Sequence, residues 1–304
     1  MSAPILFALG EHQEFARRLA VRLDAEFGAL EVRRFPDGET YLRYRTPCEG
    51  RAAILVCTLD RPDEKFAPLI FAAEAARNLG AAAVGLVSPY LAYMRQDRRF
   101  QTGEAVTSTY FARAISTVFD WLVTVDPHLH RHASLNEIYT IPTRTAHAAP
   151  LIADWVKTEV DRPIFIGPDA ESAQWVGAVA DGAGAPCVVL EKLRRGDREV
   201  EISVPNIGRW LDSTPVLVDD VISTGRTMIE TIGRLVRAGM RGPVCIAVHG
   251  VFAGSAYRDL LAAGASRVAT TNTIPHESNR IDVCELISGA VGAVLAEISG
   301  PRDR

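Results

Sequence analysis

Short hydrophobic runs alternate with longer amphipathic stretches along the whole chain. The runs predict buried β-strands at nine places, namely residues 5–9, 53–59, 84–89, 122–125, 164–166, 188–190, 216–218, 245–251 and 268–271. This alternation is typical of βαβ units, in which helices connect parallel strands. The sequence therefore predicts an α/β fold with largely parallel sheets flanked by helices.

The strand pattern occurs twice, which indicates two domains. At 304 residues the chain exceeds the size at which one core usually stops growing, so two domains of roughly 150 residues are expected. Residues 138–150 contain two prolines and many small or polar side chains, as linkers do. We expect an N-terminal domain over residues 1–146 and a C-terminal domain over 147–304, with the final helix packing back on the N-terminal domain.

Composition narrows the classes of partner. The chain is 48% hydrophobic and 23% charged, and its net charge of -4 argues against a broad nucleic-acid-binding surface. No apolar run reaches the ~20 residues that span a bilayer, and residues 1–10 lack a signal-peptide pattern. The five cysteines have no zinc-site spacing and are expected to be buried packing residues. We therefore expect a cytoplasmic protein that binds small molecules, with no nucleic-acid or membrane partner.

The strongest chemical signal follows the predicted strand at 216–218. Asp219 and Asp220 come directly after it, and a short turn containing Gly225 then opens a helix. Glycine permits close backbone approach, and the exposed N–H groups of a helix start attract an anion. Three hydroxyl groups can donate further hydrogen bonds, those of Ser223, Thr224 and Thr227. This arrangement predicts a phosphate cradle.

The two aspartates are expected to bind a part of the ligand other than its phosphate. Carboxylates repel a phosphate, but vicinal ribose hydroxyls are good donors to them. A sugar phosphate would satisfy both the acids and the cradle. The alternative is a capped helix with two solvated aspartates.

Residues 216–227 resemble the loop that phosphoribosyltransferases and phosphoribosyl-pyrophosphate synthases share. The resemblance implies that ribose 5-phosphate is bound by Asp219, Asp220, Ser223, Thr224, Gly225, Arg226 and Thr227. The chain departs from the usual pattern at Arg226, where a small residue is commonest. We interpret Arg226 as an additional cation for the 5-phosphate.

Residues 35–39 are similar to a synthase motif that receives adenine across a subunit interface. The resemblance implies that Phe35, Asp37 and Glu39 bind ATP in a homo-oligomer. By residue chemistry alone, Asp37 and Gly38 between two strand-like runs form a hairpin turn.

Residues 90–99 resemble the synthase ATP segment. The resemblance implies that Arg95, Gln96, Asp97 and Arg98 hold the base and the triphosphate, and guanidinium groups suit forked phosphate contacts. The alternative is a surface salt-bridge cluster formed by Asp97 and the neighbouring arginines.

Residues 123–128 and 167–169 are similar to the synthase metal segments. They imply that His128 and Asp169 contact Mg2+ or its waters, with His128 also on the ATP side. A histidine after a proline also serves as a capping or packing residue. The second segment departs from the family, because Glu171, Ser172, Ala173 and Trp175 stand where two glycines and an arginine are usual.

Residues 189–195, followed by the alternating residues 199–204, resemble the synthase's flexible catalytic hairpin. Lys192 and Arg194 alternate with Leu193, so they project from one face of an extended strand. The resemblance implies that both residues are catalytic. Basic residues at a hairpin edge also guard against aggregation.

Together these segments resemble the ribose-phosphate pyrophosphokinase family over most of the chain. The family implies two tandem phosphoribosyltransferase-type domains and transfer of diphosphate from Mg-ATP to the C1 hydroxyl of ribose 5-phosphate, giving phosphoribosyl pyrophosphate and AMP. Neither a Walker motif nor a Gly-x-Gly-x-x-Gly motif is present. The alternatives are a phosphoribosyltransferase and a synthase-like regulatory subunit without activity.

Overall fold

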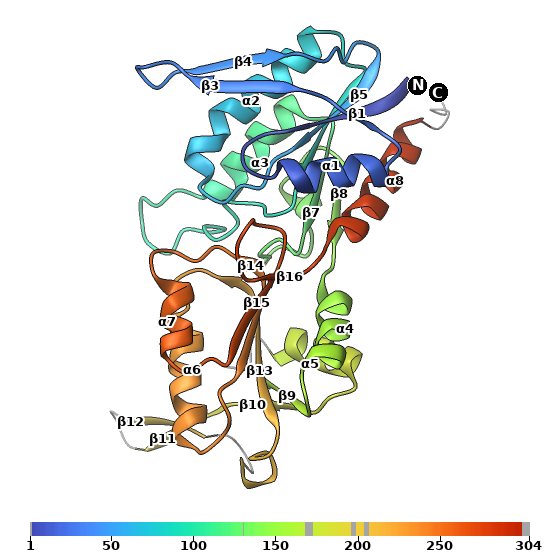
Figure 1. Cartoon of the computed structure of the whole chain (residues 1–304). Helices are drawn as coiled ribbons and strands as arrows, with labels where there is room; N and C mark the ends of the chain where they lie inside the picture. Colours follow the sequence, from blue (N-terminus) through green and yellow to red (C-terminus); the bar gives the residue numbers. More distant parts are fainter. Residues whose placement is uncertain (1, 130, 168–172, 196–198, 204–206, 300–304) are drawn as a thin grey trace. The chain divides into compact units, whose positions relative to one another are not determined.

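The computed structural model describes the chain except for residues 1, 130, 168–172, 196–198, 204–206 and 300–304 (Figure 1). The chain forms two compact units. Unit 1 contains the chain up to His147, the short segment Thr273–Pro275 and the C-terminal part from Cys284. Unit 2 contains Ala148–Asn272 and His276–Val283.

Unit 1 is built on a six-stranded parallel sheet with the order β2-β1-β5-β6-β7-β8. Its strands are β1 (Ser2–Ala8), β2 (Glu26–Phe27), β5 (Arg51–Val56), β6 (Ala83–Ser88), β7 (Trp121–Val125) and β8 (Thr143–Ala146). Its helices are α1 (Gln13–Arg22), α2 (Pro62–Asn78), α3 (Thr107–Val118) and α8 (Cys284–Ser299), with a 3-10 turn η1 (Leu135–Glu137). The C-terminal helix α8 packs against α1, β7 and β8.

The central strands of unit 1 are apolar along nearly their whole length because helices cover both faces of a parallel sheet. Gly85 on β6 pairs in register with Trp121 on β7. A side chain at Gly85 would place its Cβ 2.0 Å from the Trp121 ring. The glycine therefore makes room for the largest fully buried side chain of the core.

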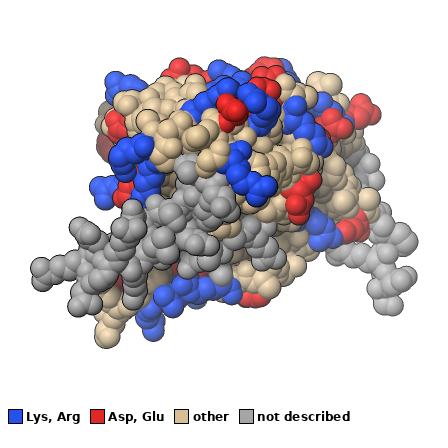
Figure 2. All heavy atoms as spheres, turned by 90° about the horizontal axis from the view of Figure 1, so that it is seen from below, with Lys and Arg blue, Asp and Glu red and all other residues tan. Residues whose placement is uncertain are grey.

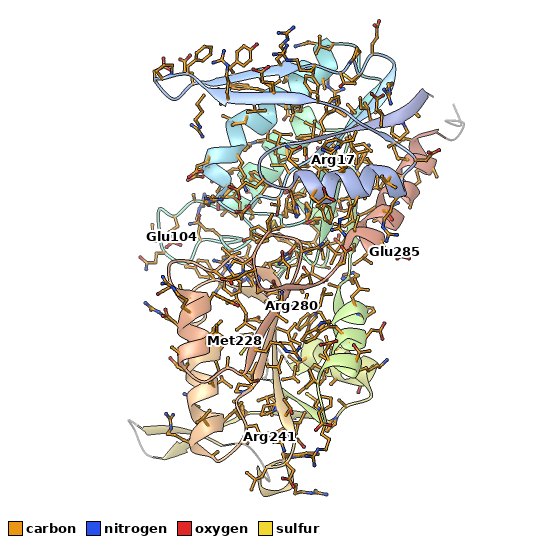
Figure 3. All side chains as sticks on the ribbon, viewed as in Figure 1. Arg17, Glu104, Met228, Arg241, Arg280 and Glu285 are labelled. Atoms are coloured by element: carbon orange, nitrogen blue, oxygen red, sulfur yellow. The ribbon has the colours of Figure 1, made fainter. Side chains whose placement is uncertain are left out.

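Unit 2 is built on a second six-stranded parallel sheet, with the order β10-β9-β13-β14-β15-β16. Its strands are β9 (Pro163–Gly167), β10 (Cys187–Val189), β13 (Thr214–Ile222), β14 (Val244–Gly250), β15 (Arg267–Thr271) and β16 (Asn279–Ile281). Its helices are α4 (Ala149–Glu159), α5 (Ala173–Ala183), α6 (Arg226–Arg237) and α7 (Ala256–Ala262), with a 3-10 turn η2 (Ile207–Arg209). Met228, labelled in Figure 3, Ile232 and Leu235 bury one side of α6.

Each unit also carries an antiparallel hairpin outside its main sheet. In unit 1 the hairpin is β3 (Leu30–Arg34) with β4 (Thr40–Tyr44), and in unit 2 it is β11 (Glu191–Arg195) with β12 (Glu199–Ser203). Both hairpins are inserted after the second sheet strand of their unit, and both sheets have the same strand order. The two units therefore share one topology.

The α/β class with two mainly parallel sheets is confirmed, and each of the nine predicted strands coincides with an observed one. One prediction was too short: β13 continues through Asp219 and Asp220 to Ile222, because its pairing with β14 continues as far as Gly250. The sequence pattern missed the short strands β2, β8 and β16.

Two surface properties bear on function. Over much of the face drawn in Figure 2, lysine and arginine side chains are interspersed with aspartate and glutamate side chains. None of the described helices is both long and apolar enough to cross a bilayer.

Four cysteines are buried as expected, but Cys187 is exposed at the start of the edge strand β10, where a neighbouring strand covers only one side.

Candidate functional site

Strand β13 carries the predicted acidic pair at its carboxyl end. Asp219 and Asp220 are both half-buried, and the main-chain N–H of Asp220 donates to Oδ1 of Asp219 at 3.0 Å. The strand continues beyond them, since Val221 and Ile222 pair with β14. Ligands of open α/β sheets bind at this edge.

The turn that follows has the backbone geometry of an anion cradle. Gly225 precedes α6 with φ +67°, a left-handed conformation that side chains disfavour. The first N–H groups of any helix have no partner within the helix, and no side chain of the N-cap residue bonds to them in α6. They are therefore available to an anion at the turn. Thr224, Arg226 and Thr227 are exposed around it, and Ser223 is half-buried. The seven residues of the predicted loop thus lie along the end of β13, the turn and the first residues of α6.

An aromatic cluster that was not predicted from the sequence lies next to this turn. The N–H of Phe252 donates to the carbonyl of Ile222 at 3.0 Å, which ties the end of β14 to the loop. The Phe252 ring centroid lies 5.4 Å from that of Tyr257 and 4.5 Å from that of His276. Burial lowers the pKa of His276, which favours a neutral ring at physiological pH. The residues after β14 are thus hydrogen-bonded to the start of the loop, since the N–H of Ala253 also donates to the carbonyl of Ser223 at 3.0 Å.

In unit 1, residues 35–39 form the turn of the β3–β4 hairpin. The N–H of Phe35 donates to the carbonyl of Glu39 at 2.8 Å, and Gly38 adopts φ +94°. The hairpin-turn interpretation is therefore correct for the backbone. The turn also leaves the Phe35 ring 40% exposed, edge-on to Tyr41 with ring centroids 6.0 Å apart. An exposed ring on a turn remains available to stack on a base.

The predicted ATP segment follows β6. Arg95 and Arg98 are exposed, whereas the carboxylate of Asp97 is only 4% exposed. Nη1 of Arg131 lies 3.0 Å from both carboxylate oxygens of Asp97. The alternative of a surface cluster with the neighbouring arginines is therefore wrong: Asp97 pairs with Arg131, and none of the three neighbouring arginines pairs with it. This ion pair joins the ATP segment to the segment that contains His128.

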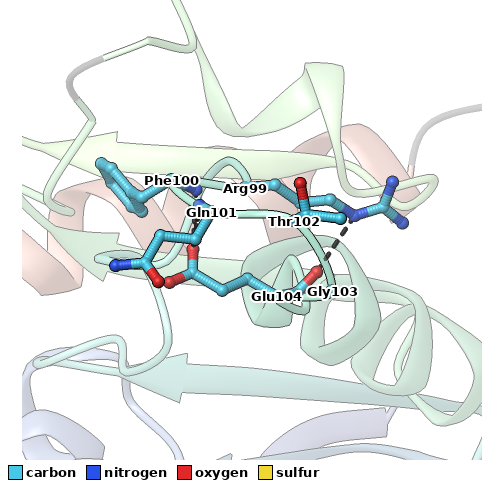
Figure 4. A pocket seen from close by; sticks show the side chains of 6 residues that line it. All are labelled: Arg99, Phe100, Gln101, Thr102, Gly103 and Glu104. Carbon is cyan, nitrogen blue, oxygen red and sulfur yellow. Dashed lines mark hydrogen bonds between the residues drawn. The ribbon is translucent and has the colours of Figure 1, made fainter.

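The loop after this segment closes on itself around Glu104. The Glu104 carboxylate accepts the N–H groups of Phe100 at 2.7 Å and Gln101 at 3.0 Å, and its carbonyl accepts Nε of Arg99 at 3.0 Å (Figure 4). Residues 99–104 line an open cavity of about 590 Å3. The Arg98 guanidinium lies 4.8 Å from the centroid of the Phe100 ring. The loop presents cationic and amide groups to solvent, as a polyphosphate site requires.

The expected metal contacts are described only in part. His128 is half-buried beyond the end of β7, whereas Asp169 lies outside the described residues, as do Glu171 and Ser172. Among the residues that the structure does describe, no three His, Cys, Asp or Glu side chains gather as a metal cluster. Asp126, near His128, has φ +30° and its Oδ1 lies 2.8 Å from Nδ1 of His147. Trp175 is half-buried in α5.

The expected basic hairpin is present as β11 and β12. Lys192 pairs with Ile202 and Arg194 pairs with Val200, so both basic positions fall on the same strand two residues apart. Residues 196–198, between the two strands, lie outside the described part of the chain. The catalytic roles of Lys192 and Arg194 stay predictions, as do the other residue assignments.

Comparison with known proteins extends over nearly the whole chain. Residues 4–118 match the family described as the N-terminal domain of ribose phosphate pyrophosphokinase, and residues 134–285 match the phosphoribosyl transferase domain. A ribose-phosphate pyrophosphokinase of Methanothermobacter thermautotrophicus is 34% identical over 91% of this chain and 95% of its own length. A ribose-phosphate pyrophosphokinase of Methanopyrus kandleri is 35% identical over 94% of this chain and 98% of its own length.

A solved structure has the same fold. The phosphoribosylpyrophosphate synthetase of Mycobacterium smegmatis superposes with a TM-score of 0.83 at 23% identity, covering 97% of this chain and all of its own. The first match contains the predicted ATP segments 35–39 and 90–99, and the second contains the predicted sugar-phosphate loop 216–227. The chain therefore belongs to the ribose-phosphate pyrophosphokinase family, which confirms the family and the class of enzyme expected from its motifs.

Proposed function

We propose that this chain transfers the β,γ-diphosphate of Mg-ATP to the C1 hydroxyl of ribose 5-phosphate. The C1 oxygen attacks the β-phosphorus, the bond from that phosphorus to the α–β bridging oxygen breaks, and AMP leaves. The hydroxyl proton passes to solvent or to a basic group. The products are 5-phosphoribosyl 1-pyrophosphate and AMP.

The β13–α6 turn is the observation that carries the proposal. It combines two half-buried carboxylates with a left-handed glycine and an uncapped helix start. The helix start suits the 5-phosphate, and Asp219 and Asp220 suit the ribose hydroxyls. The exposed guanidinium of Arg226, at the first position of α6, supplies a further cation for the phosphate.

Unit 1 supplies the nucleotide side in this proposal. Phe35 stacks on adenine, with Asp37 and Glu39 as hydrogen-bond partners. Arg95, Gln96, Arg98 and His128 hold the base and the phosphates. Because the Asp97 carboxylate is paired with Arg131, we assign Asp97 to holding the segment in place as well as to ATP. Lys192 and Arg194 neutralise charge on the transferring phosphate oxygens.

The side chains available to bind Mg2+ suit this ion only in part. Magnesium binds through few carboxylates, several waters and substrate phosphates, so the lack of a three-ligand cluster among the described residues does not conflict with it. His128 and Asp169 are the residues that would hold it, directly or through water. When bound, the ion would neutralise the phosphate oxygens and orient the β-phosphorus.

The assembly and the location are also proposals. An adenine site completed by Phe35 of a neighbouring copy would need at least a homodimer, and the exposed Phe35 ring supports that role. A cytoplasmic site of action, where ATP and ribose 5-phosphate are available, stays a prediction.

The test is to incubate purified protein with Mg-ATP and ribose 5-phosphate and to quantify AMP and phosphoribosyl pyrophosphate together. Equal formation of both supports the proposal. Product from phosphoribosyl pyrophosphate and a free base, without ATP, would support a transferase instead. If both substrates bind and neither reaction occurs, the chain is a regulatory subunit, and Trp175 and Arg226 become the first positions to revert.

A further inference from the structure

Helix α2 contains a proline in its second turn. Pro68 has no N–H, so the main-chain carbonyl of Glu64, four residues earlier, lacks the donor that an α-helix normally provides. A helix carbonyl without its donor needs another partner or water. This gap in the hydrogen bonding of α2 lies on the side that faces the β3–β4 hairpin, since Glu64 and Pro68 line one cavity together with hairpin residues.

Arg34, the last residue of β3, fills the gap. Its Nη2 donates to the Glu64 carbonyl at 3.2 Å, and its Nη1 donates to the Gly38 carbonyl at 3.2 Å. One planar guanidinium therefore joins the turn of the hairpin to the helix. Arginine suits this task because its donors diverge from a rigid fork, which a lysine ammonium lacks.

A second contact with the same helix fixes the other end of the hairpin. The hydroxyl of Tyr44, the last residue of β4, donates to the carbonyl of Ala72 at 2.8 Å. Burial raises the pKa of Tyr44 far above its ordinary value, so the hydroxyl stays protonated and remains a donor. Tyr44 is half-buried, whereas Arg34 is exposed. The contact at the tip is thus the weaker one, and its loss leaves the base of the hairpin in place.

We propose that Arg34 is a positioning residue for the nucleotide. It holds the turn 35–39 against α2 through the carbonyl that Pro68 leaves open, and so fixes Phe35 and Glu39 for adenine. The cavity between the hairpin and α2 measures about 450 Å3 and is lined by Glu39 as well as by Arg34. This inference rests on the proposed function, in which the turn receives the base.

The kinetic test compares five variants with the wild type, namely four single substitutions and one double variant. Arg34→Met keeps much of the aliphatic stem but removes both donors. We expect it to raise KM for Mg-ATP by roughly three- to tenfold, the range for losing solvent-exposed hydrogen bonds from a charged group. KM for ribose 5-phosphate and kcat should change by less than about twofold, because neither depends on the adenine contact. Arg34→Lys should recover part of the loss.

Arg43→Met is the matched control. Arg43 is an exposed arginine on the same hairpin, opposite Glu31 in the β-ladder, so the variant removes the same charge without touching the Glu64 carbonyl. Its KM for Mg-ATP should stay at the wild-type value. A rise equal to that of Arg34→Met would attribute the effect to charge alone and overturn the proposal.

Pro68→Ala tests the role of the open carbonyl. Alanine restores an N–H that competes with Arg34 for Glu64. We expect Arg34→Met to raise KM by a smaller factor in the Pro68→Ala background than in the wild type, because part of the contact is already lost. Equal factors in both backgrounds would show that Arg34 does not act through that carbonyl.

Hydrogen exchange separates this inference from the proposed function. The N–H groups of Phe35 and Gly38 close the turn, and they should exchange faster in Arg34→Met while the amides of β5 stay protected. If the wild type makes no phosphoribosyl pyrophosphate, the proposed function fails while the exchange result still tests the contact. Unchanged exchange together with unchanged KM would overturn the inference.

Discussion

Replacing Gly225 by alanine should weaken the binding of ribose 5-phosphate without blocking the fold. The residue has φ +67° and ψ 8°, in the left-handed region that costs an L-residue about 1–2 kcal/mol. Space is not the obstacle, because an added Cβ would lie 3.5 Å from Leu260, an ordinary contact. If the loop of the variant keeps this conformation, the free energy of unfolding should fall by about 1–2 kcal/mol.

The same strain predicts the change in affinity. To the extent that the loop of the variant relaxes when empty, the strain no longer lowers the unfolding free energy and instead weakens binding, because the loop must return to the left-handed conformation to bind the phosphate. At about 1.4 kcal/mol per tenfold change, full relaxation would raise KM for ribose 5-phosphate by roughly five- to thirtyfold. KM for Mg-ATP should change much less. Initial rates at varied ribose 5-phosphate, with urea unfolding of the same samples, measure both quantities.

Gly239→Ala is the matched control for this prediction. Gly239 has φ +84° at the other end of α6, and an added Cβ would meet Leu211 at 3.8 Å, so the strain is of the same kind in similar space. A helix of 12 residues places this glycine about 18 Å from Gly225. It should lower stability by a similar amount and leave KM unchanged. If Gly239→Ala raised KM for ribose 5-phosphate as much as Gly225→Ala does, the effect would not be specific to the turn, and the reasoning would be refuted.

Three further outcomes are expected. Lys192→Ala should lower kcat far more than it changes the affinity for ribose 5-phosphate, and equal losses would remove it from catalysis. Arg131→Met leaves the buried Asp97 carboxylate unpaired and should lower the unfolding free energy by about 1–2 kcal/mol in urea titrations, with Arg131→Lys in between. In the native protein Cys187 should react first with a thiol reagent at pH 8 because it is the exposed cysteine, but more slowly than a free thiol, since desolvation and Asp181 raise its pKa. Burial raises the pKa of Cys57 and Cys245 to about 12 and also covers the other two, so all five thiols together should react only after unfolding.

The parts of the site that were predictable are local in sequence. The acids, the turn and the helix start of the phosphate loop lie within a dozen residues, and each residue type has a local reason for its place. The central strands were equally clear because their apolar runs are buried on both faces. Strands β2 and β16, with two and three residues, are too short to show a period.

The contacts that escaped prediction join distant segments. Asp97 and Arg131 are 34 residues apart, and Arg34 and Glu64 are 30 apart. Any of the neighbouring arginines satisfies the charge pattern around Asp97 equally well, and only the fold selects Arg131. The contact of Arg34 depends on a missing N–H at Pro68, which the sequence displays but does not connect to the hairpin.

The shared topology of the two units points to their ancestry. A tandem gene duplication accounts for two sheets of identical strand order with a hairpin inserted at the same place. The counterpart of the phosphate loop in unit 1 is the connection from β5 to α2. There Arg61 takes the left-handed position with φ +59°, Pro62 removes the first N–H of the helix, and Asp60 is ion-paired with Lys65.

That connection is a poorer anion cradle than the β13–α6 turn, because Pro62 removes one N–H donor and the Asp60 carboxylate already pairs with Lys65. If the β13–α6 turn binds the sugar phosphate as proposed, the two units have diverged at this connection, and unit 2 is the one that carries a left-handed glycine there. The hairpins show the same divergence, since one presents an exposed phenylalanine and the other carries Lys192 and Arg194. Replacing Arg61 by glycine and substituting Pro62 and Asp60 would test whether this connection can bind a phosphate.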